Sequence, residues 1–178
     1  MTLAIILVVV AALALALILR LSFPRSLRVS YTSLATQIQP VDIEAFRNLV
    51  DPGEDEYLRR RLSPSEFRTV RRERLRAMAA YIQVSARNAA VLVRLGQAAL
   101  AAADPHTADA ARQLVENGIL LRRNAAYALF RIYVALAWPQ AVSSALPVLS
   151  GYERLSGSAM RLGRLQNPAA PLRISATL

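Results

Sequence analysis

The fold of this chain is decided by one stretch, residues 63–103, which reads SPSEFRTVRRERLRAMAAYIQVSARNAAVLVRLGQAALAAA. Ser63, Pro64 and Glu66 predict the start of a helix, because serine caps a first turn, proline suits its first position and a glutamate three residues after the serine completes a capping box. No other proline occurs before Pro105, and the stretch holds a single glycine. We therefore expect one continuous helix, ~60 Å long at 1.5 Å per residue.

Further helices are predicted on both sides of this stretch. A break at Asp104-Pro105 starts a second helix, which we expect from about Thr107 to Trp138. A third helix is expected from about Gln140 to Leu165, and a short helix from Val41 to Val50 opens the body. Because long helices joined by short turns pack antiparallel, we expect an all-α body, residues 41–166, built as an antiparallel hairpin of long helices or as a small helical bundle.

The N-terminus has the composition of a membrane span. Residues 2–19, TLAIILVVVAALALALIL, carry no charge, and about 20 helical residues cross a hydrocarbon core of ~30 Å. We expect a single transmembrane anchor over residues 1–22. A cleaved signal peptide is the alternative, but no basic residue precedes the apolar run and no A-x-A cleavage site follows it. The arginines that follow the run, starting with Arg20, predict a cytoplasmic body at a bacterial-type inner membrane.

Two segments are not expected to form helices of the body. Residues 23–40 are read as a juxtamembrane linker between the anchor and the first short helix. Residues 167–178, NPAAPLRISATL, are read as an extended tail rich in proline and alanine.

The composition argues against catalysis. The chain has no cysteine and one histidine. Its net charge is +10, and because it contains no lysine, this positive charge comes from arginines. His106 follows Pro105 in a predicted turn, where the neighbouring acids are better explained as helix caps than as partners of a catalytic base. No phosphate-binding glycine loop and no metal-ligand motif occurs. We expect no catalytic residue, no cofactor and no metal, so the chain is not predicted to be an enzyme.

The arginines of the long helix fall into two groups when they are placed at 100° per residue. Four form a stripe on the solvent side: Arg72, Arg76, Arg87 and Arg94. Arg71 and Arg74 project instead into the apolar sector, where an unpaired charge costs several kcal/mol. The acidic segment of residues 42–56 is the nearest source of counter-charge, so we expect Arg71 and Arg74 to pair with it.

Local ion pairs are predicted just before the long helix. Asp55 with Arg59 and Glu56 with Arg60 have the i,i+4 spacing that stabilises helices. Because this acidic segment and the arginines after it nearly cancel, contact of these arginines with lipid or a partner is less favoured than pairing within the chain. Nucleic acid is the least favoured partner, since phosphate binding needs an uncompensated basic field and no reading motif is present.

The second long helix contains an unusually apolar stretch, Ile119–Trp138, ILLRRNAAYALFRIYVALAW. It is either the central helix of a bundle, buried on most sides, or a helix with one face left for the bilayer or a protein. In the second case the contact residues are aromatic: Tyr127, Phe130, Tyr133 and Trp138.

These features favour an interaction protein. We expect a membrane-anchored helical accessory protein, such as a small subunit of a larger membrane complex, that binds a protein partner or a second copy of itself. The aromatic residues of the second long helix would make the apolar contact, and the stripe of four arginines would form its electrostatic rim. The alternative is a peripheral domain that binds an anionic lipid surface and is tethered by one span.

Overall fold

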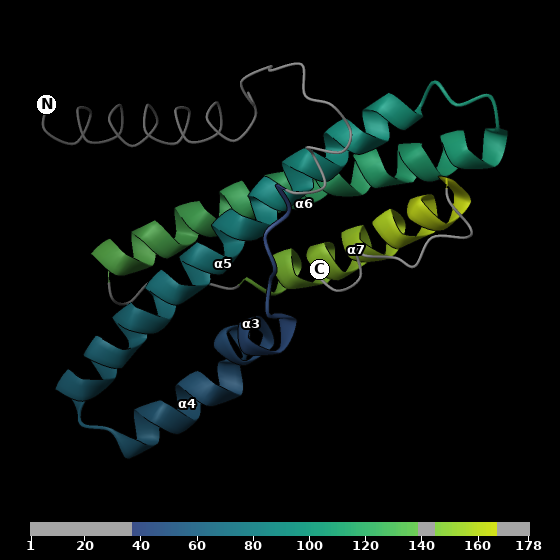
Figure 1. Cartoon of the computed structure of the whole chain (residues 1–178). Coiled ribbons are helices and arrows are strands. Elements are labelled where there is room, and N and C mark those ends of the chain that lie inside the picture. Colours follow the sequence, from purple (N-terminus) through teal and green to yellow (C-terminus); the bar gives the residue numbers. More distant parts are fainter. Residues whose placement is uncertain (1–36, 139–144, 167–178) are drawn as a thin grey trace, which may run out of the picture.

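The computed structural model describes residues 37–138 and 145–166, and within them every regular element is a helix (Figure 1). The helices are α3 (Ile43–Val50), α4 (Pro52–Arg61), α5 (Pro64–Ala99), α6 (Pro105–Ala137) and α7 (Leu146–Gln166). The all-α prediction is confirmed. The predicted anchor (1–22), most of the linker and the tail (167–178) lie outside the described residues. None of the described helices combines the length and apolar character that a membrane crossing needs.

Helices α5 and α6 form an antiparallel pair, joined by a short turn (Figure 1). The pair packs closely where small residues meet a facing helix. A Cβ atom at Gly96 would lie 2.8 Å from Val115 of α6, and one at Gly118 would clash with Val93 of α5. Valine is stiff at χ1 and cannot move aside easily, so both glycines are required by the close approach of the two helices.

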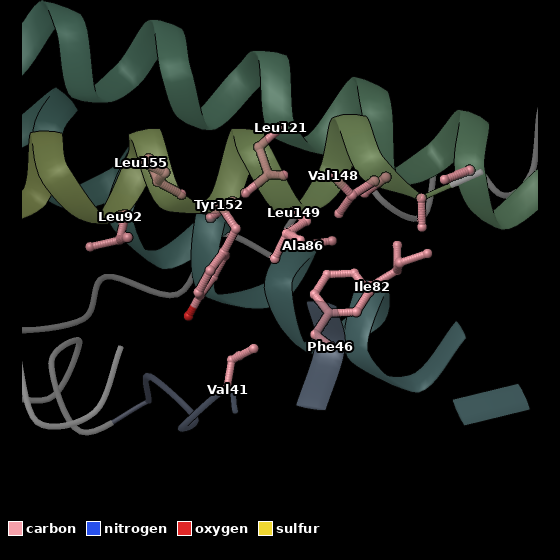
Figure 2. Close-up of a cluster of buried hydrophobic side chains, with 14 of the residues drawn as sticks. Val41, Phe46, Ile82, Ala86, Leu92, Leu121, Val148, Leu149, Tyr152 and Leu155 are labelled. Carbon is pink, nitrogen blue, oxygen red and sulfur yellow. The ribbon is translucent and has the colours of Figure 1, made fainter. Parts of the chain in front are cut away.

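Helix α7 packs on this pair and makes the body a small bundle rather than a hairpin alone. Leu121 of α6 and Leu155 of α7 are completely buried, and Gly151 lets α7 approach Leu121 (Figure 2). The apolar sector predicted for α5 forms the core, with the following residues buried: Leu75, Met78, Ile82, Ala86, Ala89, Leu92 and Val93. Leu100 lies just past the end of α5 and is 40% exposed.

The sequence pattern missed helix α4. Asp51-Pro52-Gly53 was read only as the end of the first short helix. The same residues also start the next helix, since the Asp51 carboxylate accepts a hydrogen bond from the Gly53 N–H at 2.9 Å and Pro52 occupies the first helical turn. At the other break, Asp104 caps α6 by accepting from the backbone N–H groups of His106 and Thr107.

A buried asparagine ties the N-terminal segment to the bundle. The Asn88 side-chain oxygen accepts from the Gln39 N–H at 3.0 Å, and its Nδ2 donates to the Gln39 carbonyl at 2.7 Å and to the Tyr152 hydroxyl at 3.0 Å. Ile38 and Val41 on either side are also buried. The core therefore extends into the segment that was predicted to be linker up to residue 40.

The hydroxyl of Tyr152 is held deep in the bundle. The side chain extends from α7 among the residues of the core (Figure 2). Burial raises the pKa of Tyr152 above its ordinary value, which the hydrogen bond from Asn88 only partly opposes. The hydroxyl thus stays protonated, and the two polar side chains form a neutral, hydrogen-bonded group inside an apolar core.

Candidate interaction surface

The buried arginine problem is resolved at Arg74 by the acidic segment, as the sequence predicts. Its side chain is 14% exposed, and its Nε lies 3.0 Å from an Asp55 carboxylate oxygen, while one terminal nitrogen lies 3.4 Å from Glu54. The Asp55 contact is an ion pair rather than a hydrogen bond, because neither atom has a hydrogen-bond partner of suitable geometry. The other terminal nitrogen donates to the carbonyls of Asn48 and Leu49 at the end of α3. Arg74 therefore joins α3, α4 and α5.

One predicted ion pair is formed and another is not. Arg60 donates to Glu56 at 3.0 Å on α4. Asp55 faces Arg74 instead of Arg59, and within the described residues Arg59 has no ion pair. The i,i+4 prediction for Asp55 and Arg59 is therefore wrong, because the buried arginine on α5 takes the carboxylate. Arg71 is half-buried, and it also interacts with a neighbouring group.

The predicted capping box opens α5. The Glu66 carboxylate accepts from the Ser63 backbone N–H at 3.0 Å and from the Ser63 hydroxyl at 2.6 Å, while the Glu66 N–H donates to Ser63 Oγ at 3.4 Å. These hydrogen bonds, that of the hydroxyl first, lower the pKa of Glu66. The box fixes where α5 begins and has a structural role.

The stripe of arginines on α5 is not uniform. Arg76 is paired with Glu73 one turn earlier, at 2.5 Å. Arg72 and Arg87 are exposed and Arg94 is half-buried. For these three the part of the chain that the structure describes supplies no carboxylate at ion-pair distance. The stripe thus contains one arginine that is paired with a carboxylate, Arg76, and three whose charge has no such partner among the described residues.

The four aromatic residues predicted as contacts are all exposed on α6. Tyr127 and Trp138 are 63% and 68% exposed, and Phe130 and Tyr133 are exposed to a smaller extent. Two exposed aliphatic residues that the sequence reasoning did not single out, Ile119 and Val134, share their side of the helix. We call the following set the α6 outer face: Ile119, Tyr127, Phe130, Val134 and Trp138.

The two sides of α6 therefore differ in burial. One side carries Leu121, Leu129 and Ile132, which are buried against α5 and α7. The opposite side is the α6 outer face. Tyr133 lies at its edge toward α5, where its hydroxyl accepts from Gln83 Nε2 at 3.1 Å. On this outer side the Arg131 guanidinium lies over the Tyr127 ring, 5.8 Å from its centre, so the surface is basic as well as aromatic.

Sequence reasoning missed one residue of this region, Arg122. Its side chain is half-buried, and burial lowers its pKa, as does the nearby positive charge of Arg94 to a smaller extent. The signal was present in the spacing: Arg122 is eleven residues before Tyr133, as Gln83 is eleven before Arg94. Only a known pairing of α5 with α6 gives that spacing a meaning.

The described residues offer no set of three His, Cys, Asp or Glu side chains that could hold a metal ion. Comparisons with protein-family models, with curated proteins and with solved structures found no match to this chain.

Proposed function

We propose that this chain is a non-catalytic, membrane-anchored interaction protein whose helical body binds a partner protein through the α6 outer face. The observation that carries the proposal is the row of large apolar side chains left exposed on a helix whose other side is completely buried. Contiguous apolar patches on a protein surface are typical of contact sites, and Tyr, Trp and Arg are the residues that contribute most to binding energy at such sites.

The membrane part of the proposal rests on the apolar run of residues 2–19. A single span with a cytoplasmic body would hold the α6 outer face close to the bilayer. A partner in the same membrane then meets this face at a high effective concentration, which allows a modest surface to bind stably. This arrangement suits an accessory subunit of a membrane complex.

Charge favours a different protein over a second copy of this chain. Between Asn117 and Ala137, α6 carries three arginines and no carboxylate. A two-fold pairing of identical α6 faces brings these like charges together, which opposes self-association. The complementary partner has an apolar centre with carboxylates around it.

Co-purification tests the proposal. The full-length chain, extracted from its own cells in mild detergent, is expected to retain one partner protein in a fixed ratio, as measured by quantitative mass spectrometry. A variant with Tyr127→Ser and Trp138→Ser is expected to lose most of that partner. Tyr57→Ser is the matched control, because Tyr57 is a similarly exposed aromatic residue on α4. Equal retention by the Tyr127→Ser/Trp138→Ser variant, or the absence of any partner in a fixed ratio, contradicts the proposal.

A further inference from the structure

A second surface lies beside the α6 outer face, where α5 and α6 meet. The hydrogen bond from Gln83 to Tyr133 fixes the pairing of the two helices on this side. Arg94 follows Gln83 by eleven residues and Arg122 precedes Tyr133 by eleven, which is close to three helical turns in each case. In an antiparallel pair these equal steps bring Arg94 opposite Arg122, and the positive charge of Arg94 contributes, after burial, to the lowered pKa of Arg122.

A third arginine belongs to the same side. Arg87 precedes Arg94 by seven residues, which is two helical turns, and therefore lies on the same side of α5. The positions between them along this side hold small residues, Ala90 on α5 and Ala126 on α6. Short side chains there leave room for long guanidinium groups to reach toward one another. We call Arg87, Arg94 and Arg122 the arginine seam.

The arginine seam has no counter-charge of its own. No carboxylate occurs on α5 after Glu73 or on α6 after Glu116. Within residues 37–138 and 145–166, no carboxylate lies at ion-pair distance from any of the three arginines. Other described arginines are of two kinds. Exposed ones such as Arg59 and Arg123 also have no carboxylate at ion-pair distance. The following have carboxylate partners: Arg47, Arg60, Arg74, Arg76 and Arg112.

Two of the seam arginines are half-buried, which makes the missing counter-charge more costly. Arg94 and Arg122 have lost part of their hydration and repel each other. An anion placed between them removes the repulsion and replaces the lost hydration. A planar guanidinium donates two parallel hydrogen bonds to phosphate oxygens, so several arginines on one side of a helix pair suit a phosphate better than a single carboxylate.

We infer that the arginine seam binds a phosphate group. A phospholipid headgroup and free inorganic phosphate both present this chemistry, and the experiment separates them. The inference uses residues other than the α6 outer face and goes beyond the proposed function. If the phosphate belongs to the anionic surface of the membrane, the seam also orients the body on the bilayer.

Binding is measured on the full-length chain in a neutral detergent at constant ionic strength, by the shifts of the arginine Nε–H signals in NMR. Three probes are titrated separately: inorganic phosphate, dihexanoyl phosphatidylglycerol and dihexanoyl phosphatidylcholine. We expect saturable shifts at the seam with phosphatidylglycerol and much weaker ones with phosphatidylcholine. Saturation by inorganic phosphate as well identifies a site for free phosphate, whereas its absence identifies an anionic lipid headgroup.

The variant Arg94→Gln/Arg122→Gln is expected to weaken binding by about tenfold or more, since each charge-assisted hydrogen bond contributes strongly. Arg59→Gln/Arg154→Gln is the matched control, because it removes the same charge from exposed arginines that have no ion pair among the described residues. Arg94→Lys/Arg122→Lys keeps the charge but not the paired donors, and an intermediate loss is expected.

Three results overturn the inference: no saturable binding of any probe, unchanged binding by the Gln seam variant, or an equal loss in the control variant. Far-ultraviolet circular dichroism is the control that tests whether each variant is folded. Co-purification with the Gln seam variant separates this inference from the proposed function, since the variant is expected to keep the partner that the α6 outer face binds.

Discussion

Two of the partly buried arginines of helix α5, Arg74 and Arg94, differ in the groups that surround them. Arg74 lies beside the acidic segment of α3 and α4 and is surrounded by two carboxylates and two helix-end carbonyls. Arg94 lies beside α6, which supplies another arginine. The burial of an arginine therefore does not by itself decide its role. The helix that packs against it decides whether the charge is used within the fold or is left for a ligand.

The substitution expected to destabilise the fold most is at Asn88, whose buried hydrogen bonds are all satisfied within the chain. Asn88→Ala leaves the Gln39 backbone groups and the Tyr152 hydroxyl without partners in the core, so the free energy of unfolding is expected to fall by about 3 kcal/mol. Urea denaturation followed by circular dichroism measures the change. Asn117→Ala, which removes one half-buried hydrogen bond to Ser158, is the control and is expected to cost about 1 kcal/mol. An equal cost for both variants contradicts the role assigned to Asn88.

Arg74→Met tests the paired arginine directly. The variant keeps a long apolar stem but leaves two carboxylates without their cation, so a loss of about 2 kcal/mol is expected in the same assay. Arg59→Met is the matched control on the exposed side of α4 and is expected to change stability by no more than about 0.5 kcal/mol. If Arg74→Met is as stable as this control, the ion pairs to α4 do not hold α5 in place.

The helix cap at Ser63 is expected to contribute less to stability than the ion pairs of Arg74. Ser63→Ala is expected to cost about 1 kcal/mol, because the first turn of α5 loses its hydrogen-bond acceptor. This result shows how much of the paired half of α5 depends on its own start rather than on Arg74. A cost as large as that of Arg74→Met would show that the cap, not the ion pairs, holds this half of the helix.

The caps also predict a dependence on pH. Hydrogen bonds from the Ser63 hydroxyl and from the Thr107 hydroxyl lower the pKa of Glu66 and of Asp104 respectively below the ordinary values of 4.5 and 3.8. Their stabilisation is complete above those values and is lost as the pH falls toward the lower pKa of the folded state. Between pH 7 and pH 3 the free energy of unfolding should decrease only below about pH 5. In the Glu66→Gln variant this decrease should be smaller.

The smallest effect on stability is expected at Arg94, which has no carboxylate partner among the described residues. Arg94→Gln removes a charge that repels Arg122 and that no described carboxylate neutralises, so the stability should stay constant or rise by about 0.5 kcal/mol at most. Urea denaturation without added phosphate is the measurement. A loss comparable to that of Arg74→Met would show that Arg94 has a structural partner and would remove the contrast between the two arginines.

Local features of the fold could be predicted from the sequence. The capping box at Ser63 and Glu66 depends on residues three apart, and the apolar sector of α5 follows from the period of the helix. The excess of acids just before α5 indicated how Arg74 would be neutralised. Helix α4 was missed because it is only about three turns long and has no apolar side, so its sequence lacks the hydrophobic period that predicts a helix.

The sequence alone determines that the chain forms long helices, where α5 begins and which side of α5 is apolar, since these depend on neighbours within a few residues. Only the tertiary structure decides that Asp55 faces Arg74 rather than Arg59, that Asn88 holds the segment at Gln39, and that the charge of Arg94 lowers the pKa of Arg122. Each of these depends on the pairing of elements far apart in the chain. The physical reason is that helical periodicity places a side chain on one side of its own helix, whereas packing against other helices decides which groups it meets there.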